Sequence, residues 1–201
     1  MKIFNKLSWI LFWGTLWGFS EVVLGKGLSD VDHASALLAI IAVILLLCAR
    51  LQLNKPGSSA VIGLITILFK LINAAPFHCH LMGIAMIAMS FEAIAFLLMK
   101  KDDKSIFSMF STSVLSTYLG HTTFALILTY IVKYKYWAQV GWPKVQNHIF
   151  VDGSLSAIGL LLLIPVIYFA TRKNIDFLPS YPKVSQVIPV FLSALLWVAV
   201  Q

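Results

Sequence analysis

His78, Cys79 and His80 follow one another in the chain and form its densest group of metal-binding side chains. Imidazole and thiolate are ligands for zinc, copper, nickel and cobalt, and histidine also ligates haem iron. His121 lies in a later apolar segment and is a candidate to complete such a site. The motif lacks the longer ligand spacings of established zinc motifs, so loop histidines without a metal are the alternative.

Five further candidates lie inside or at the ends of apolar segments: Glu21, Lys70, Asn73, His121 and Asp152. An ionisable side chain in hydrocarbon is costly unless it faces the interior of a helix bundle and meets a partner. These residues therefore predict a polar pocket for a small-molecule or metal-ion ligand. In such a pocket Lys70 would pair with an anionic group and Glu21 with a cationic one.

Each of these residues also has a purely structural interpretation. Glu21 could reach the membrane interface, and Lys70 could form an ion pair with Glu21 or Glu92. For the other three the structural roles are a cap at a helix end (Asn73), an interhelical hydrogen bond (His121) and a helix N-cap (Asp152).

Seven apolar segments must position these side chains, at about 8–25, 34–49, 57–75, 81–99, 106–132, 151–171 and 186–200. The first six approach the roughly 20 residues that a membrane-spanning helix needs. The seventh is shorter and has Pro189 near its start. It is predicted either to span the membrane or to lie against the bundle.

The composition agrees with this division. Of the 201 residues 60% are apolar and 11% are charged, whereas soluble domains carry about 25% charged residues. A soluble globular enzyme, a disordered chain and a disulfide-rich module are excluded. The sequence predicts one all-α domain over residues 1–201, a polytopic transmembrane bundle of six to seven spans in the lipid bilayer of the cell membrane.

The basic residues predict the orientation of this bundle. Ten lysines and arginines lie at segment ends on the side of the N-terminus, and four lie on the other side. By the positive-inside rule the N-terminus is cytoplasmic, and most pocket candidates lie toward the outer side. The same placement at segment ends explains the net charge of +7, so no nucleic-acid partner is indicated.

Gly14 and Gly18 form a GxxxG pattern in the first segment. Small residues four positions apart allow another helix to approach closely. The pattern predicts either packing within the chain or a docking face for another membrane subunit.

Gly14 and Gly18, together with the Pro/Gly-rich start of the third segment (Lys55-Pro56-Gly57-Ser58-Ser59), carry a family resemblance. The chain resembles the substrate-binding S components of energy-coupling factor transporters in the architecture of its first six segments. The resemblance implies high-affinity capture of a vitamin or metal ion, with transport driven by a separate coupling protein and ATPases.

Three functions remain open from the sequence. The first is a transport or substrate-capture protein with a pocket open to the outer side. The second is a membrane metalloprotein or haem protein, an enzyme or an electron-transfer subunit, that uses His78, His80 and His121. The third is a non-catalytic subunit of a larger membrane complex. The sequence has no Walker motif and no HExxH motif, so these routes to ATP hydrolysis and proteolysis are not indicated.

Overall fold

The computed structural model describes residues 2–28, 31–74, 77–99, 105–172 and 184–201. This part of the chain consists of helices joined by short turns and contains no strand, which confirms the predicted all-α class. The elements are α1 (Lys2–Gly27), α2 (Ala34–Leu53), α3 (Ser58–Asn73), α4 (His78–Leu98), α5 (Ile106–Leu126), η1 (Ile127–Ile131), α6 (Lys135–Val140), α7 (Trp142–Gln146), η2 (Asn147–Asp152), α8 (Gly153–Arg172) and α9 (Val184–Val198), where η marks a π-helical turn.

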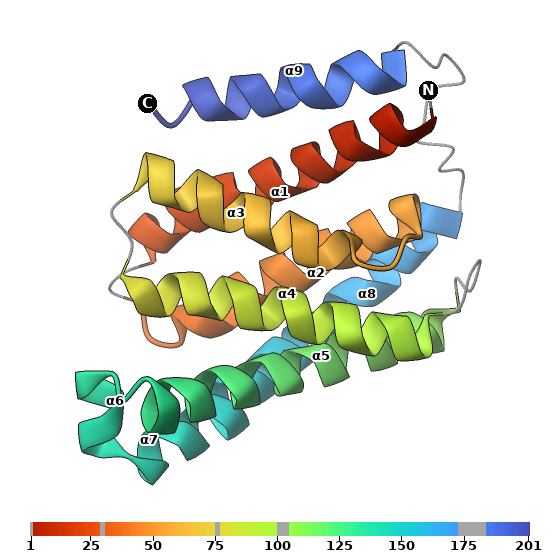
Figure 1. Ribbon diagram of the computed structural model, residues 1–201. Helices are drawn as coiled ribbons and strands as arrows, with labels where there is room; N and C mark the ends of the chain where they lie inside the picture. Colours follow the sequence, from red (N-terminus) through yellow and green to blue (C-terminus); the bar gives the residue numbers. More distant parts are fainter. Residues whose placement is uncertain (1, 29–30, 75–76, 100–104, 173–183) are drawn as a thin grey trace.

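The long helices form two layers (Figure 1). Helices α3, α4 and α5 lie side by side in one layer, and α1, α2 and α8 form the other. Helix α2 packs against α1, α3, α4, α5 and α8, and its side chains Val43, Leu46 and Leu47 are fully buried. The short helices α6 and α7 lie at one end of the bundle, which we call the α6–α7 end. The C-terminus lies at this end and the N-terminus at the opposite one (Figure 1).

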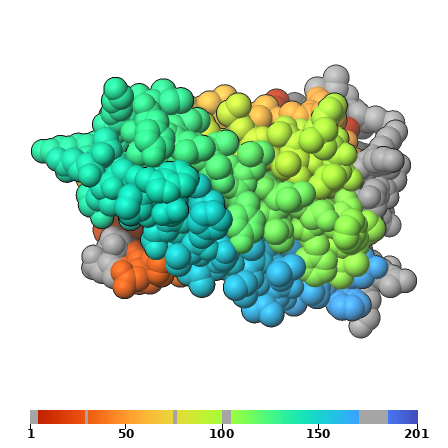
Figure 2. Space-filling view, turned by 90° about the horizontal axis from the view of Figure 1, so that it is seen from below, coloured from red at the N-terminus to blue at the C-terminus, as the bar shows by residue number. Residues whose placement is uncertain are grey.

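Within the described part of the chain, five helical segments are long and apolar enough to cross a membrane: Asn5–Gly27, Ala34–Leu53, His78–Leu98, Ile106–Ile131 and Trp142–Ala170. Two shorter apolar helices accompany them, Ser58–Asn73 and Gln186–Val198. Apolar side chains also cover much of the surface. Helices α5 and α8, which are visible in Figure 2, expose Phe107, Leu162, Val166 and Phe169.

Glycines of α1 allow it to lie directly on α3. A Cβ atom built on Gly14 would lie 2.6 Å from the Cβ of Ile65, and one on Gly18 would lie 2.6 Å from the Cβ of Phe69. Both distances are shorter than any real contact, so the two backbones approach this closely only because these positions are glycine. Thr66 adds a hydrogen bond of 3.0 Å to the carbonyl oxygen of Gly14. The GxxxG pattern is therefore used for packing within the chain.

The sixth apolar segment begins earlier than the sequence predicted. Instead of starting at residue 151, the helix starts at Trp142 and continues through α7, η2 and α8 to Arg172. Gly141 separates it from α6 with φ 69° and ψ −138°, a conformation that only glycine adopts readily. Pro143 occupies the first turn, where its missing N–H costs nothing. The helix begins with polar residues, so an analysis of apolar runs does not detect its start.

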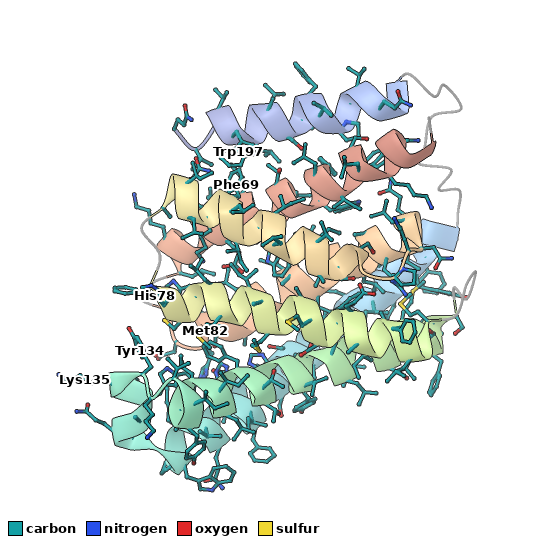
Figure 3. The ribbon with its side chains drawn as sticks, viewed as in Figure 1. Phe69, His78, Met82, Tyr134, Lys135 and Trp197 are labelled. Atoms are coloured by element: carbon teal, nitrogen blue, oxygen red, sulfur yellow. The ribbon has the colours of Figure 1, made fainter. Side chains whose placement is uncertain are left out.

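Helix α9 lies against α1, on the far side of α1 from α2 (Figure 1). Trp197 of α9 meets Phe69 of α3 edge-on, with 4.5 Å between the ring centroids (Figure 3). The seventh predicted segment is thus a helix packed alongside the others, with Pro189 inside it.

Candidate functional site

A cavity of about 1080 Å³ lies between the two layers at the α6–α7 end. Its walls come from α1, α2, α3, α4 and α5, with His148 of η2 and the last residues of the chain at its edge. Most of the wall is apolar, and Trp17, Ala42 and Ile87 reach it from three different helices. Its ionisable and amide side chains are Glu21, Lys26, Lys70, Asn73, Cys79, His80, His121 and His148.

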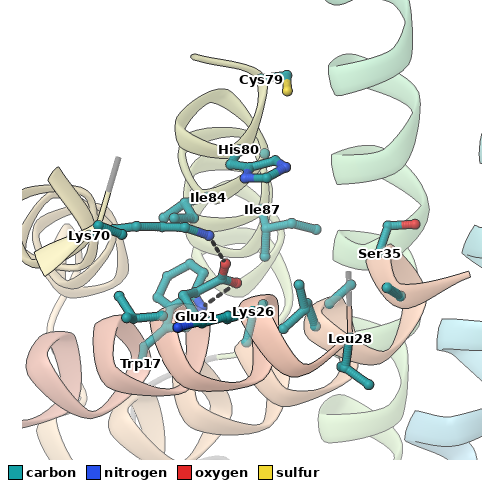
Figure 4. A pocket seen from close by; sticks show the side chains of 18 of the residues that line it. Trp17, Glu21, Lys26, Leu28, Ser35, Lys70, Cys79, His80, Ile84 and Ile87 are labelled. Atoms are coloured by element: carbon teal, nitrogen blue, oxygen red, sulfur yellow. Dashed lines mark hydrogen bonds and ion pairs between the residues drawn. The ribbon is translucent and has the colours of Figure 1, made fainter. Parts of the chain in front are cut away.

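Glu21 and Lys70 form a buried ion pair in this wall (Figure 4). The Nζ of Lys70 donates to Oε2 of Glu21 at 2.7 Å, and the indole Nε1 of Trp17 donates to Oε1 at 3.3 Å. Glu21 and Lys70 are 7% and 5% exposed, so neither charge is solvated by bulk water. The predicted pairing of Lys70 is therefore with Glu21 of α1 and not with Glu92.

Two more cavity residues stand near this pair. Asn73 lies one turn after Lys70 on α3 and donates its Nδ2 to the carbonyl oxygen of Phe69 at 2.9 Å. This bond lies within the last turn of α3, whose C-cap residue is Ala74, so it is not the predicted cap; Asn73 also lines the cavity. His80 of α4 lines the cavity above the ion pair (Figure 4).

A chain of hydrogen-bonded side chains begins at the same wall. His121 of α5 contacts His148 of η2, with 3.0 Å between Nδ1 and Nε2. The Nδ1 of His148 lies 2.7 Å from Oδ2 of Asp152, and the Nδ1 of His33 lies 2.6 Å from Oδ1 of the same carboxylate. Ser35 of α2 donates to Oδ2 at 2.9 Å. The chain therefore joins α2, η2 and α5 through one carboxylate.

The π-helical turn η2 places two members of this chain. His148 and Asp152 are four residues apart, so they lie on one face of a helix and can touch. π-helical turns inside α-helices occur frequently at functional sites. The ring of His148 is held among aromatic rings, with Phe124 and Trp137 each at 5.2 Å between centroids. The imidazole is thereby fixed between its two hydrogen-bonding partners.

Asp152 is not the N-cap that the sequence suggested. It lies inside the continuous helix from Trp142 to Arg172, so the backbone N–H groups after it are already bonded within the helix. Its carboxylate is free to accept from the side chains of His33, Ser35 and His148 instead. His121, predicted to bind a metal or another helix, forms interhelical hydrogen bonds to His148 and, at 3.2 Å, to Ser156.

The histidines around Cys79 do not converge on a metal site. They occupy the first turn of α4 and not a loop, and successive residues of an α-helix point about 100° apart. His78 is exposed at the end of α4 (Figure 3), whereas Cys79 packs near the cluster of Leu128, Trp137 and Val145. His121 is engaged with His148. Among the described residues, no three histidine, cysteine, aspartate or glutamate side chains lie close enough together to hold a metal ion.

Glu92 belongs to a separate polar cluster at the opposite end. Its carboxylate accepts from the backbone N–H groups of Gly57 and Ser59 at 2.7 and 3.0 Å, and from Arg50 at 3.3 Å. The carboxylate therefore caps the N-terminus of α3 and pairs with a buried arginine. This cluster fixes the turn between α2 and α3 and takes no part in the cavity.

Sequence analysis missed His148, His33, Ser35 and Ser156 as members of the site. The spacing of His148 and Asp152 is the signal that could have found the first of them, once the helix is extended back to Trp142. The other three come from contacts between α2, α5 and α8 that no local pattern encodes.

Comparisons with protein-family models, with curated proteins and with solved structures found no match to this chain.

Proposed function

We propose that this protein is a multi-pass membrane protein that captures a small solute in the cavity at the α6–α7 end. The observation that carries the proposal is the buried Glu21–Lys70 pair in the wall of a cavity of about 1080 Å³. Ligand cavities of small molecules commonly measure about 300–1,000 Å³, with apolar walls and a few convergent polar groups. This cavity has the same character.

The chemistry of the wall favours a solute with an apolar body and an ionised group. The ammonium of Lys70 has three N–H donors, and one of them is used by Glu21. The amide oxygen of Asn73 and the imidazole of His80 offer further polar contacts. Trp17, Ile84 and Ile87 provide apolar surface beside these groups (Figure 4).

The membrane arrangement is part of the proposal. Seven helices (α1 to α5, α8 and α9) run along one direction, and five of them meet the length and hydropathy expected of a membrane span. Lys26, Lys133, Lys135 and Lys144 lie at the α6–α7 end, and of the described residues Lys2, Lys6, Arg50, Lys55 and Arg172 belong to the opposite end. The positive-inside rule then places the N-terminus in the cytoplasm and the cavity toward the outside.

Capture of the energy-coupling factor type would leave the driving step to separate subunits. The sequence has no Walker motif, which is consistent with ATP hydrolysis by separate subunits. The two other candidate functions have less support. The predicted ligands His78, His80 and His121 do not converge, and the glycine face of α1 is covered by α3.

The test is mass spectrometry of small molecules bound to the full chain, purified gently in lipid nanodiscs. The double variant Glu21→Leu/Lys70→Met removes both charges together and leaves no unpaired charge in the wall. We expect the wild-type protein to carry a stoichiometric solute and the double variant to retain at most a tenth of it.

His78→Gln is the matched control, because His78 is exposed and does not line the cavity. It should retain the solute as the wild-type protein does. A solute that binds equally well to the double variant, or a wild-type protein without any bound solute, would contradict the proposed function.

A further inference from the structure

The carboxylate of Asp152 is a buried charge, and no lysine or arginine of the described residues bonds to it. Its hydrogen-bonding side chains are His33, Ser35 and His148. The residue is 7% exposed, and an uncompensated buried charge is strongly destabilising. Only an added proton on the neighbouring imidazoles or on the carboxylate itself can neutralise it in this arrangement.

For an ionised Asp152 and neutral imidazoles, the hydrogen bonds indicate which ring nitrogen carries the hydrogen before a proton is added. An ionised carboxylate only accepts, so the Nδ1 atoms of His33 and His148 both carry hydrogen. The Nε2 of neutral His148 is then an acceptor, and the Nδ1 of His121 donates to it. The Nε2 of His121 is left to accept from the hydroxyl of Ser156. Every group in the chain is satisfied, and the chain carries one negative charge.

One additional proton also leaves every group satisfied. With hydrogen on both nitrogens, His121 donates through Nε2 to Ser156, whose own hydroxyl turns to the carbonyl oxygen of Asp152 at 2.8 Å or of Ala36 at 3.2 Å. The hydroxyl of Ser156 thus has a partner in either state. The same heavy-atom positions accommodate the chain with and without the proton.

We propose that Asp152, His148 and His121 form a binding site for a single proton, and that this site reaches the wall of the cavity through His121 and His148. A proton that binds Nε2 of His121 releases the Nδ1 proton of His121 to Nε2 of His148. The Nδ1 proton of His148 then passes to Oδ2 of Asp152. Three bonds to hydrogen form and two break, so the hydrogen-bonded group from His121 to Asp152 gains one proton and becomes neutral.

His33 gives the same carboxylate a route to water. Its side chain is 41% exposed, whereas those of His148 and Asp152 are 8% and 10% exposed. His33 can pass its Nδ1 proton to Oδ1 of Asp152 and take another from water at Nε2. Because His121 and His148 line the cavity, the carboxylate exchanges protons with both the cavity and the bulk solution.

Other ionisable groups face this chain from the helices around it. Tyr118 of α5 bonds Ser154 at 2.8 Å, beside the chain. Cys79 and His80 of α4, Glu21 and Lys26 of α1, and Lys70 of α3 line the same cavity. Lys144 of α7 lies over Trp137, which packs on His148. Glu21 is paired with Lys70, whereas the side chains that bond Asp152 are His33, Ser35 and His148; Asp32 lies beside His33 in the chain.

The experiment is a pH titration of the full chain in nanodiscs, labelled with ¹⁵N in its histidine rings and followed by NMR. The chain has five histidines, and single substitutions assign their signals. At high pH we expect His121 and His148 both to carry hydrogen on Nδ1. As the pH falls, the NMR signals of both rings should change in a single shared step.

Two single substitutions, one at Asp152 and one at its partner Ser35, should change the strength of proton binding in opposite directions. Asp152→Asn removes the negative charge, so the chain should bind the shared proton at least tenfold more weakly. Ser35→Ala removes a neutral donor that stabilises the ionised carboxylate, so the proton should bind more tightly. If Asp152→Asn fails to fold, Ser35→Ala together with the wild-type titration decides the question. Separate titration steps of His121 and His148, or unchanged proton binding in both variants, would overturn the proposal.

Discussion

At the scale of single residues, each buried polar group has a large effect on the free energy of folding, because its surroundings are apolar. Glu21 and Lys70 are separated by 49 residues in sequence, and their charged atoms lie 2.7 Å apart. In a medium of low dielectric constant their attraction is strong, but so is the cost of removing each charge from water. Each of the two charges can be buried only because the other one lies next to it.

This interdependence gives a prediction for stability. Lys70→Met leaves Glu21 buried without a cation and should lower the free energy of unfolding by about 3–5 kcal/mol. The double variant Glu21→Leu/Lys70→Met should lose much less, because neither charge remains. Denaturant-induced unfolding in detergent measures both values. A double variant that is at least as unstable as Lys70→Met would show that the pair is not coupled in this way.

Sequence analysis named both residues of this pair and gave their pairing as one of two alternatives. It also named Asp152 and His121. The interhelical hydrogen bond that it gave as one alternative for His121 is present, whereas the N-cap role of Asp152 is wrong. A capping role for Asp152 followed from placing the helix start at residue 151, and a metal role for His121 followed from grouping it with the other histidines. Hydrogen bonds across helices decide both cases.

At the scale of helices, glycine positions set how closely α1 can lie on α3. Gly14 and Gly18 occupy one face of α1, one turn apart, and the side chains of Ile65 and Phe69 fill the space above them. This contact brings Glu21, almost one turn further along α1, next to Lys70 of α3. The ion pair in the cavity therefore depends on the glycines.

Gly18→Ala should destabilise the protein by about 1–3 kcal/mol, because the added methyl group overlaps the side chain of Phe69 and pushes α1 from α3. Gly27→Ala is the matched control on the same helix, since no atom lies within 4 Å of its added Cβ. Thermal unfolding of the two variants under identical conditions makes the comparison. Equal stability would mean that α1 and α3 can separate without cost.

The helix boundaries show what apolar runs can and cannot predict. Segments bounded by charge or proline, such as α3 and α5, begin within two residues of the predicted positions. The helix that ends at Arg172 begins nine residues before the predicted position. A helix continues through amphipathic and polar turns as long as its backbone hydrogen bonds continue. The missed part contains His148, so an error in one boundary concealed a member of the site.

At the scale of the whole molecule, the arrangement of helices makes a prediction about topology. The N-terminus and the C-terminus lie at opposite ends of the bundle (Figure 1). If this bundle spans the membrane as proposed, the two ends lie on opposite sides, with the N-terminus in the cytoplasm.

Reporter proteins that are active on only one side of the membrane, fused separately to each end of the full chain, measure this topology. The N-terminal fusion should report the cytoplasm and the C-terminal fusion the outside. A fusion to the loop between α6 and α7, after Val140, should agree with the C-terminal one. Two ends on the same side would show that α9 does not cross.

The sequence alone determined the class of the protein. A chain with 60% apolar and 11% charged residues has long apolar segments between charge, proline and glycine, and in a membrane such segments satisfy their backbone hydrogen bonds as helices. The same sequence identified the ionisable residues that such helices must shelter, because their cost in hydrocarbon does not depend on the details of packing.

Only the tertiary structure decided which of these residues meet. Apolar helices can pack in several orders with similar burial, so periodicity does not reveal which faces come together. Here close contact of α1 with α3 pairs Glu21 with Lys70. Contacts among α2, α5, η2 and α8 join Asp152 directly to His33, Ser35 and His148, and through His148 to His121. The physical reason is that hydrogen bonds and ion pairs act over about 3 Å, a distance set by helix packing and not by position in the sequence.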